Sequence, residues 1–379
     1  MIELDIINLF KQICHNINVN IIKRINDMTS IKIGDKIIGD NSPCFTIAEA
    51  GANHEGDISK AFELIDSAKK AGVDAIKFQT YSAERLTTKT APKYWDDGID
   101  NETQFDVFKK LDSLNKDEWK KIFDYANQKA ILCFSTPFDE DAVDLLDSLN
   151  VPAFKIASAD ITHIPLIKKI ASKKKPIFIS TGMATMKEIE EAVDTIKKEG
   201  NKKIIIMHCI TSYPTKPEDA NLEMIRTLEE EFPDYVIGYS DHTLGIDVAS
   251  FSRLFGSNCI EKHFTHNKNL TVSRDHRLSL DSEDFKELIN KMKLIDISKG
   301  SSVRSEFPSE VDSIKYARRS IVSKEKIEKG SKITLEMVDV KRPGTGIQPK
   351  FLEKILGKVV VRDILEDVPI TWDDIENYE

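Results

Sequence analysis

Two histidines at the ends of apolar runs are the residues best placed to do chemistry in this chain. His242 follows the run 236–241, and His263 closes the run 258–263. If both runs are neighbouring strands of a parallel barrel, their imidazoles meet at one rim. Two neutral imidazoles can hold a divalent metal and leave coordination positions open for water or substrate. A single barrel histidine is more often a hydrogen-bonded core residue, so the pairing carries the prediction of a catalytic metal site.

Short apolar runs alternate with stretches of helical periodicity between Cys44 and about Lys299. The runs are 45–49, 75–79, 131–135, 153–157, 177–180, 204–208, 236–240 and 259–263. Helical spacing covers 58–71, 139–149, 187–198 and 249–255, and Asn115 with Glu118 resembles a capping box that opens another helix. This alternation predicts an α/β fold, a (β/α)8 TIM barrel with right-handed crossovers.

Nearly every run ends in polar side chains. Strand alternation places Lys77 and Gln79 on one face of their strand, and likewise Glu261 and His263. A strand end that simply reaches water explains any one of these residues about as well as a function does. For all the runs together that explanation is poor, because barrel active sites lie at the carboxyl ends of the strands.

The 379 residues suit one barrel of about 250 residues and a small additional domain. We predict an N-terminal extension without assigned function at 1–30, a barrel domain at 31–299, a linker at 300–317 and a C-terminal domain at 318–379. The polar connection 81–114 is predicted to be a rim loop or lid. The C-terminal domain is predicted to contain short β segments at 320–323, 332–335, 337–340, 358–361 and 368–371.

Bulk properties exclude several classes of protein. The formal net charge of −9 argues against a general nucleic-acid binder. No apolar stretch reaches the roughly 18 to 20 residues needed to cross a bilayer. The five cysteines are scattered and form no Cys-x-x-Cys, so we expect no disulfide framework and a reducing, cytoplasmic location.

An ordered series of motifs resembles the sialic acid synthase (N-acetylneuraminate synthase) family. The matching segments are 48–54 (AEAGANH), 75–80 (AIKFQT), 134–138 (FSTPF), 154–158 (FKIAS), 180–183 (STGM), 208–215 (HCITSYPT), 238–243 (GYSDHT) and 261–265 (EKHFT). In the C-terminal domain, 317–320 and 341–344 are similar to the family's antifreeze-like (SAF) domain. The resemblance runs from about Ile31 to the end of the chain. It implies a transferase that joins phosphoenolpyruvate, an N-acetylated hexose such as N-acetylmannosamine, and water into a nonulosonic acid. Phosphate is released by C–O cleavage.

The resemblance also implies roles for individual residues. Lys77 and Lys155 match lysines that bind phosphoenolpyruvate, and Thr136, Ser158, Ser180 and Ser240 match the hydroxyl donors. His242 and His263 match the two ligands of Mn²⁺ or Mg²⁺. Glu49 matches the carboxylate that handles protons, and orienting Lys77 is the alternative role. His208 is expected to line the site, although a three-histidine zinc site is conceivable.

On the sugar side the resemblance implies contacts from Gln79, Asp160, Tyr213 and Asp275. Arg342 matches an arginine that reaches the acetamido group across a domain-swapped homodimer, and Tyr316 matches an aromatic residue near that contact. Both residues would then serve the barrel of the other copy.

Departures from one branch of the family leave the identity of the sugar open. Ala157-Ser-Ala-Asp160 replaces Gly-Ser-Gly-Glu, Thr211 replaces asparagine, and Val272-Ser-Arg274 replaces Pro-Gly-Pro. The candidates are N-acetylmannosamine, its 6-phosphate, and a diacetamido deoxyhexose. Arg274 and Arg277 could meet a sugar phosphate, but we predict that they form a solvated rim.

Two other functions compete with this prediction. A related barrel synthase could make another 2-keto sugar acid, such as a heptulosonate or octulosonate phosphate, but the antifreeze-like domain argues against it. A non-catalytic protein that binds ice or a glycan is the second. Such a protein would not need lysines, a carboxylate and paired histidines at the strand ends of one cavity.

Overall fold

The computed structural model describes residues 29–40, 42–95, 102–112, 114–270, 272–301 and 303–376. The chain divides into two compact units between Gly300 and Ser301. Most of the predicted N-terminal extension, residues 1–28, lies outside the described residues. None of the helices in the described ranges combines the length and apolar character that a membrane span requires.

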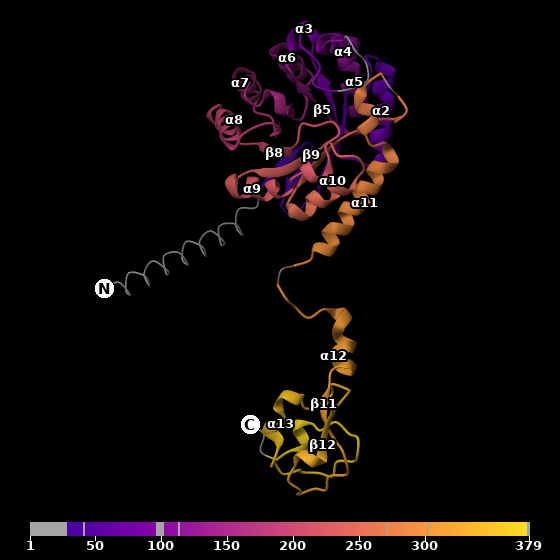
Figure 1. Ribbon diagram of the computed structural model, residues 1–379, viewed down its shortest axis with the longest axis vertical. Helices are drawn as coiled ribbons and strands as arrows, with labels where there is room; N and C mark the ends of the chain where they lie inside the picture. Colours follow the sequence, from indigo (N-terminus) through magenta and orange to yellow (C-terminus); the bar gives the residue numbers. More distant parts are fainter. Residues whose placement is uncertain are drawn as a thin grey trace, which may run out of the picture. The chain divides into compact units, whose positions relative to one another are not determined.

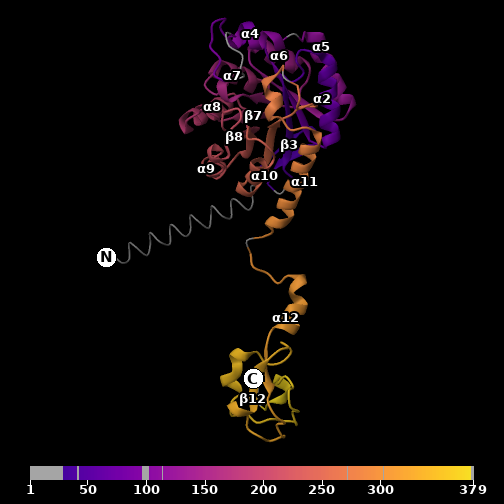
Figure 2. The ribbon, with the colours of Figure 1, turned by 45° about the vertical axis from the view of Figure 1, so that its right-hand side comes forward.

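The first unit is built around a closed barrel of parallel strands (Figures 1 and 2). The order of the strands around the barrel is β10-β3-β4-β5-β6-β7-β8-β9. The strands are β3 (Phe45–Gly51), β4 (Ala75–Thr80), β5 (Leu132–Pro137), β6 (Phe154–Ile156), β7 (Ile177–Ser180), β8 (Ile204–Cys209), β9 (Val236–Asp241) and β10 (Cys259–His263). Each corresponds to one predicted apolar run. The predicted (β/α)8 barrel is therefore confirmed.

Helices form the outer layer of this barrel (Figures 1 and 2). They are α2 (Ile58–Ala71), α5 (Lys116–Gln128), α6 (Glu140–Ser148), α7 (Ile164–Ser172), α8 (Met186–Lys198), α9 (Glu223–Glu231), α10 (Asp247–Ser252) and α11 (Ser282–Lys299). The predicted capping box is confirmed, because Asn115 accepts from the backbone of Glu118 and the Glu118 side chain accepts from the backbone of Asn115. The (β/α)8 prediction implies helices at the places of α7, α9 and α11, but no bounds were assigned to them.

The barrel interior is filled with aromatic side chains directly beneath the polar strand ends. Phe134 and Phe178 stack with ring centroids 5.1 Å apart, and Phe45 lies 6.3 Å from Phe178. These rings come from alternate strands of the barrel, which is how side-chain layers form in this fold. Phe134 and Phe178 precede Thr136 and Ser180 by two residues, so strand alternation places the polar layer just above the aromatic one.

A hairpin that we did not predict covers the amino-terminal ends of the strands. It consists of β1 (Ser30–Ile33) and β2 (Lys36–Gly39), paired antiparallel. The Thr29 hydroxyl donates to the carbonyl of Pro233 (3.3 Å), just before β9, and Lys36 pairs with Asp74 (3.1 Å), just before β4. The hairpin therefore lies at the end of the barrel opposite the polar strand ends.

The segments predicted as a rim loop or lid and as a linker contain helices to which no bounds were assigned. The connection 81–114 contains α3 (Ala83–Leu86) and α4 (Gln104–Leu111), and the linker 300–317 contains α12 (Val311–Ala317). Thr103 and Asp106 form a capping box that begins α4. The polar composition of 81–114 concealed this amphipathic helix.

The second unit has a small core of its own and little regular sheet. Strand β11 (Ser320–Ser323) pairs antiparallel with β12 (Val338–Lys341). Isoleucine and valine side chains from both strands and from the later turns form the core: Ile321, Ile327, Ile333, Val338, Ile347, Ile355, Val360, Ile364, Ile370 and Ile375. The strands predicted at 332–335, 358–361 and 368–371 are wrong, because only isolated bridges form there.

Candidate active site

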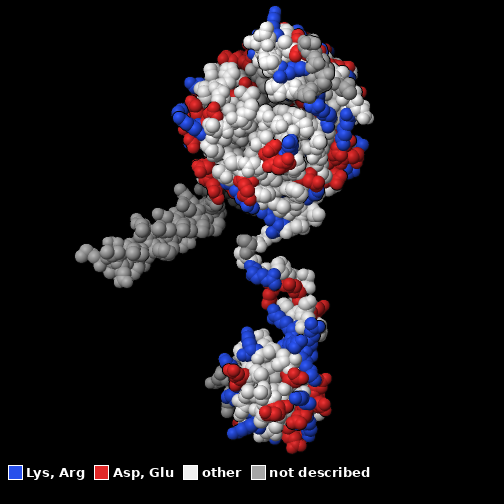
Figure 3. Space-filling model, viewed as in Figure 1, with Lys and Arg blue, Asp and Glu red and all other residues white. Residues whose placement is uncertain are grey.

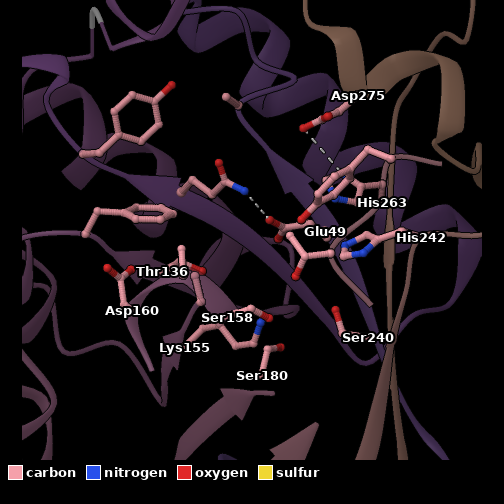
Figure 4. A pocket seen from close by; sticks show the side chains of 18 of the residues that line it. Glu49, Thr136, Lys155, Ser158, Asp160, Ser180, Ser240, His242, His263 and Asp275 are labelled. Carbon is pink, nitrogen blue, oxygen red and sulfur yellow. Dashed lines mark hydrogen bonds and ion pairs between the residues drawn. The ribbon is translucent and has the colours of Figure 1, made fainter. Parts of the chain in front are cut away.

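A cavity of about 510 Å³ opens at the carboxyl ends of the barrel strands (Figure 4). The structure brings together in its wall every barrel residue that was assigned a catalytic, metal-binding or substrate-binding role: Glu49, Lys77, Gln79, Thr136, Lys155, Ser158, Asp160, Ser180, Tyr213, Ser240, His242, His263 and Asp275. Tyr316 and Arg342 belong to the unit Ser301–Glu379, where both are exposed (Figure 3 shows the charged side chains of each unit). Strand alternation accounts for the residues on strands, since each of them faces the barrel axis.

Four charged side chains form what we call the floor of the cavity: Glu49, Lys77, Lys155 and Glu261. Lys77 Nζ lies 2.6 Å from a Glu49 oxygen and 3.7 Å from a Glu261 oxygen. Lys155 Nζ lies 3.1 Å from the other Glu261 oxygen. These side chains are only 2–5% exposed. Two positive and two negative charges therefore balance in a desolvated cluster, which is how buried charges are tolerated.

The two floor carboxyl groups have different pKa values. Burial raises the pKa of Glu49, and Lys77 offsets that effect only in part. Burial also opposes ionisation of Glu261, but Lys155 and Lys77 outweigh it and lower the pKa of Glu261 to about 2. Glu261 thus stays ionised, whereas Glu49 is the more easily protonated of the two. Carboxyl groups separated in this way are typical of acid–base sites.

Hydroxyl groups surround the two lysines. Lys77 donates to Thr136 Oγ1 (3.1 Å), and Ser240 donates to Glu261 (3.1 Å). Ser158 Oγ accepts from the backbone of Gly182 (3.0 Å). Ser180 Oγ is buried and has no hydrogen-bond partner among the described residues. Figure 4 shows Lys155, Ser158 and Ser180 gathered on one side of Glu49. Two ammonium groups with several hydroxyl donors match the needs of a small anion.

His242 and His263 lie side by side on the other side of Glu49 (Figure 4), with ring centroids 5.3 Å apart. His242 Nδ1 is 2.8 Å from the carbonyl oxygen of Ile210, which can only accept, so this nitrogen carries the proton. Burial opposes protonation of His242, but Cys209 and the Ile210 carbonyl outweigh it and raise the pKa of His242 above its ordinary value. In the neutral form of this ring the lone pair lies on Nε2. Burial lowers the pKa of His263 to about 4, so its imidazole is neutral near pH 7.

This pair fits a divalent metal that also binds small molecules. Neutral imidazoles are metal ligands, and a carbonyl partner on the second nitrogen is the usual way to orient one. Among the described residues no cluster of three or more histidine, cysteine, aspartate or glutamate side chains could hold a metal ion. A metal here would therefore have only these two imidazoles as protein ligands of that kind, with its other positions open.

A buried ion pair lies on the opposite face of the same two strands. Lys262 Nζ is 2.6 Å from Asp241 Oδ2, and neither side chain has any exposure. Lys262 also donates to the carbonyl of Thr243 (2.6 Å), and the Tyr239 hydroxyl donates to Asp241 (3.0 Å). Asp241 and Lys262 are direct partners in the β9–β10 register. Each immediately precedes a cavity histidine, so the pair fixes the strands at the point where the imidazoles emerge.

Residues of the connections that follow the strands form the rim of the cavity: Tyr81, Asp160, Arg274 and Asp275. Arg274 and Asp275 are 17% and 15% exposed, more than the floor. Burial raises the pKa of Asp160 to about 6. Tyr81 Oη, Asp160 Oδ2 and Arg274 Nη1 are buried without a hydrogen-bond partner among the described residues. Asp275 Oδ2 lies 3.7 Å from His263 Nδ1, a contact drawn in Figure 4. The rim thus holds polar atoms that a ligand could satisfy.

The segment 81–114 contributes an apolar wall to the same cavity. Its lining side chains are Tyr81, Leu86, Tyr94, Gln104, Val107, Phe108 and Leu111. Tyr81 packs edge to face against Phe108 and against Phe138 (5.6 and 5.9 Å). The predicted rim position of this segment is confirmed, although part of it is helical.

Three sequence-based interpretations need correction or addition. His208 does not line the cavity: its Nε2 is 2.8 Å from the carbonyl of Ala220, and its ring stacks on Tyr239. Its neighbour Cys209 faces inward instead. Arg274 is not a solvated rim residue, because it lines the cavity, whereas Arg277 is exposed as predicted. Glu261 was not among the predicted site residues, although its place two residues before His263 put it on the same face.

The comparisons agree with this geometry. The NeuB family model matches residues 64–304, and the SAF domain model matches residues 318–376. An uncharacterized protein of Methanocaldococcus jannaschii is 45% identical over 92% of this chain and 99% of its own length. The N,N'-diacetyllegionaminic acid synthase of Legionella pneumophila is 38% identical over 90% of this chain and 98% of its own.

A solved structure of a sialic acid synthetase is also similar to this chain. The N-acetylneuraminic acid synthetase of Leptospira borgpetersenii, in complex with citrate, superposes with a TM-score of 0.68 at 34% identity. The alignment covers 76% of this chain and 95% of that chain. The resemblance to sialic acid synthases and the SAF nature of the C-terminal domain are both confirmed.

Proposed function

We propose a function from one premise: this chain belongs to the NeuB family, whose members are synthases of sialic-type acids. In our proposal it condenses phosphoenolpyruvate, an N-acylated amino-hexose and water into a nonulosonic acid and phosphate. One observation carries the proposal. A single cavity holds two lysines among hydroxyl donors on one side and two histidines on the other, which suits an anionic donor beside a carbonyl acceptor.

Phosphoenolpyruvate would bind at the floor. Its phosphate and carboxylate would accept hydrogen bonds from Lys77 and Lys155 and from the hydroxyls of Thr136, Ser158, Ser180 and Ser240. Charge-assisted hydrogen bonds of this kind contribute roughly 1.5–3 kcal/mol each. Because each lysine is already paired with a floor carboxylate, the donor would share these ammonium groups with Glu49 and Glu261.

In the proposed reaction C3 of phosphoenolpyruvate attacks the open-chain aldehyde carbon, and the aldehyde oxygen takes up a proton. The new C–C bond leaves positive charge on C2, and water adds there with loss of a proton. The bond from C2 to the phosphate oxygen then breaks, the C2 hydroxyl gives up its proton to the departing phosphate, and the 2-keto group remains. Glu261, held ionised by the lysines, would stabilise the charge at C2, and Glu49 would accept the proton from water. Such proton transfer is worth about 10²–10⁴-fold in rate.

The alternative role for Glu49 is to orient Lys77, and the 2.6 Å ion pair between them is compatible with it. A pH–rate profile separates the two roles. If Glu49 transfers protons, Glu49→Gln loses the acidic limb of kcat. If Glu49 only orients Lys77, that limb persists at a lower rate.

His242 and His263 would hold Mn²⁺ or Mg²⁺, which would polarise the carbonyl oxygen of the sugar aldehyde. Manganese binding can be measured without turnover by electron paramagnetic resonance. We expect one bound ion per chain in the native protein and none in His242→Ala or His263→Ala, with the fold unchanged by circular dichroism. Native stoichiometry in either variant would contradict this assignment.

We propose that the sugar carries no phosphate. The cationic side chains that line the cavity are Lys77, Lys155 and Arg274, and the first two would be occupied by the donor. The lining carboxylates Asp160 and Asp275 and the apolar wall from 81–114 would disfavour a second phosphate dianion. An uncharged amino-hexose meets neither difficulty.

We further propose a homodimer in which Arg342 and Tyr316 of one copy serve the cavity of the other. The test is complementation. Arg342→Ala and His263→Ala should each be inactive alone, and mixed dimers should regain activity because one cavity then has both native residues. Mixed dimers without activity would overturn the proposal that each copy supplies Arg342 to the cavity of the other.

The decisive experiment for the reaction uses phosphoenolpyruvate labelled with ¹⁸O at the bridging oxygen, Mn²⁺, and a panel of amino-hexoses with and without a 6-phosphate. We expect phosphate release only when an unphosphorylated amino-hexose is present, with the label in phosphate. Absence of release across the panel would overturn the synthase function. Label in the keto acid would overturn C–O cleavage, and preference for a phosphorylated sugar would overturn the sugar class.

A further inference from the structure

Arg274 occupies an unusual environment at the rim of the cavity. It begins the 3₁₀ helix η4 (Arg274–Leu278), which follows β10. Its guanidinium lies 3.8 Å from the ring centroid of Trp95, and the centroids of Tyr213 and Tyr94 are 5.3 and 5.6 Å away. Stacking on aromatic faces holds an arginine in one orientation. The side chain is therefore positioned before any ligand binds.

One donor group of this arginine lacks an acceptor in the part of the chain that the structure describes. Nε faces Asp275 Oδ1 at 3.5 Å, whereas Nη1 is buried and has no hydrogen-bond partner among the described residues. Leaving a buried donor unsatisfied is unfavourable. Since Arg274 lines the cavity, a ligand in the cavity can supply the missing acceptor.

The surroundings indicate what kind of acceptor fits. The adjacent Asp275 carboxylate offsets the charge of Arg274, so the site is close to neutral. Tyr94 and Tyr213 offer aromatic surface in the same wall. A carbonyl oxygen joined to a methyl group matches this combination of one donor and apolar faces. A phosphate would instead meet one partly neutralised cation and a nearby carboxylate.

We propose that Arg274 is a specificity-determining residue that donates from Nη1 to the carbonyl oxygen of an acylamino group on the sugar. This inference rests on the proposed function. The acylamino group is a second one, distinct from the group that would be reached by Arg342 of the other copy. The chain would thus select hexoses with two acylamino substituents over hexoses with one.

The kinetic test compares two hexoses that differ only in whether a second hydroxyl is replaced by an acetamido group. Arg274→Ala should raise the KM for the diacylamino sugar by about 10- to 100-fold, with a much smaller effect on the monoacylamino sugar. The KM for phosphoenolpyruvate should stay within about twofold. An equal effect on both sugars would overturn the selectivity.

Two conservative variants distinguish a carbonyl from an anion. Arg274→Gln keeps an N–H donor without charge, and Arg274→Lys keeps charge without the planar fork. We expect Gln to preserve more affinity for the diacylamino sugar than Lys. The reverse order, together with a preference for a phosphorylated sugar, would overturn the proposal in favour of an anion site. The control is Arg277→Gln, an exposed arginine in the same helix that does not line the cavity.

A binding measurement separates this proposal from the proposed function. Because Arg274 covers the Trp95 ring, sugar binding should change tryptophan fluorescence in the absence of phosphoenolpyruvate. We expect the diacylamino sugar to produce a signal that Arg274→Ala reduces and Trp95→Phe removes. If no sugar supports phosphate release but this signal persists, the synthase function fails and the subsite stands. If turnover occurs but the two sugars bind equally well, the subsite fails and the function stands.

Discussion

The floor and the rim of the cavity are organised in opposite ways. In the floor, Glu49, Lys77, Lys155 and Glu261 come from strands, and each charge faces an opposite charge within 3.7 Å. In the rim, Tyr81 Oη, Asp160 Oδ2 and Arg274 Nη1 are buried without a hydrogen-bond partner among the described residues. Two floor oxygens, Glu49 Oε2 and Glu261 Oε2, also lack a hydrogen bond, but both face the charge of Lys77. The floor is thus electrostatically complete before a ligand arrives, and the rim is not. We therefore expect the floor to bind the common donor, phosphoenolpyruvate, and the rim to recognise a particular sugar.

The strongest test of this difference removes one floor charge. Lys77→Met should lower kcat/KM at least about 10³-fold, because the donor loses an ammonium group. It should also destabilise the fold by about 3–5 kcal/mol, since Glu49 and Glu261 lose a buried partner. Phosphate release and urea unfolding measure the two effects.

A double variant tests whether the lost ion pair between Lys77 and Glu49 causes the loss of stability. Lys77→Met with Glu49→Gln should recover much of the lost stability and none of the activity. A single Lys77→Met variant as stable as the native protein would remove the electrostatic contrast between floor and rim.

The outer pair of Asp241 and Lys262 provides a charge pair that is equally buried but lies outside the cavity. Asp241→Asn should destabilise the fold by about 3 kcal/mol, because Lys262 loses its counter-charge. It should also weaken Mn²⁺ binding about 10-fold by loosening the support of His242, as the loss of a residue that orients a metal ligand does. Urea unfolding and titration with Mn²⁺ measure these two effects. An unchanged KM for phosphoenolpyruvate would show that the outer pair, unlike the floor, does not act on donor binding. Unchanged manganese affinity would limit the pair to a structural role.

Replacing a carboxylate by its neutral amide in the rim should instead stabilise the protein. Burial raises the pKa of Asp160 to about 6 from an ordinary value near 3.8, so folding favours the neutral acid. Native stability contributed by this group is therefore present below pH 3.8 and lost as pH rises through about 6. Asp160→Asn should be more stable than the native protein at pH 8 by at most about 3 kcal/mol.

The pH dependence is the check. Urea unfolding should show the advantage of Asp160→Asn shrinking as pH falls from 8 towards 4, while the sugar KM rises at neutral pH. An advantage that does not change with pH would mean that the carboxylate is not destabilised in the rim.

The smallest effect is expected at His208, which contacts neither floor nor rim. His208→Gln should cost about 1 kcal/mol of stability through the hydrogen bond to Ala220. The KM values for both substrates should stay within about twofold. A tenfold rise in either would show that this side chain reaches the cavity.

The floor was largely predictable from the sequence, and the rim was not. Period-two alternation determines which strand residues face the barrel axis, so the strand pattern alone is enough to place Glu49, Lys77 and Lys155. The same rule applied to Glu261, but its importance depends on lysines from two other strands. No local pattern reports pairings across a barrel.

Loop contacts depend on how distant segments fold back. Arg274 becomes a cavity residue because Trp95, far earlier in the chain, lies over it, and neither residue's neighbours indicate that contact. The missed hairpin β1–β2 did have a local signal. Gly34, with φ of 60°, begins a two-residue connection between strands, a typical hairpin turn. In the second unit, short segments rich in isoleucine and valine suggested strands where only single bridges form.

The Asp241–Lys262 pair has a consequence for how such a protein can diversify. Sliding β10 by one residue against β9 would separate a carboxylate and an ammonium in an interior without water, which the fold resists. The spacing of the two imidazoles is therefore inherited from the backbone ladder and not from the loops above it. Substitutions in those loops can change which sugar is accepted while the catalytic geometry underneath stays in place.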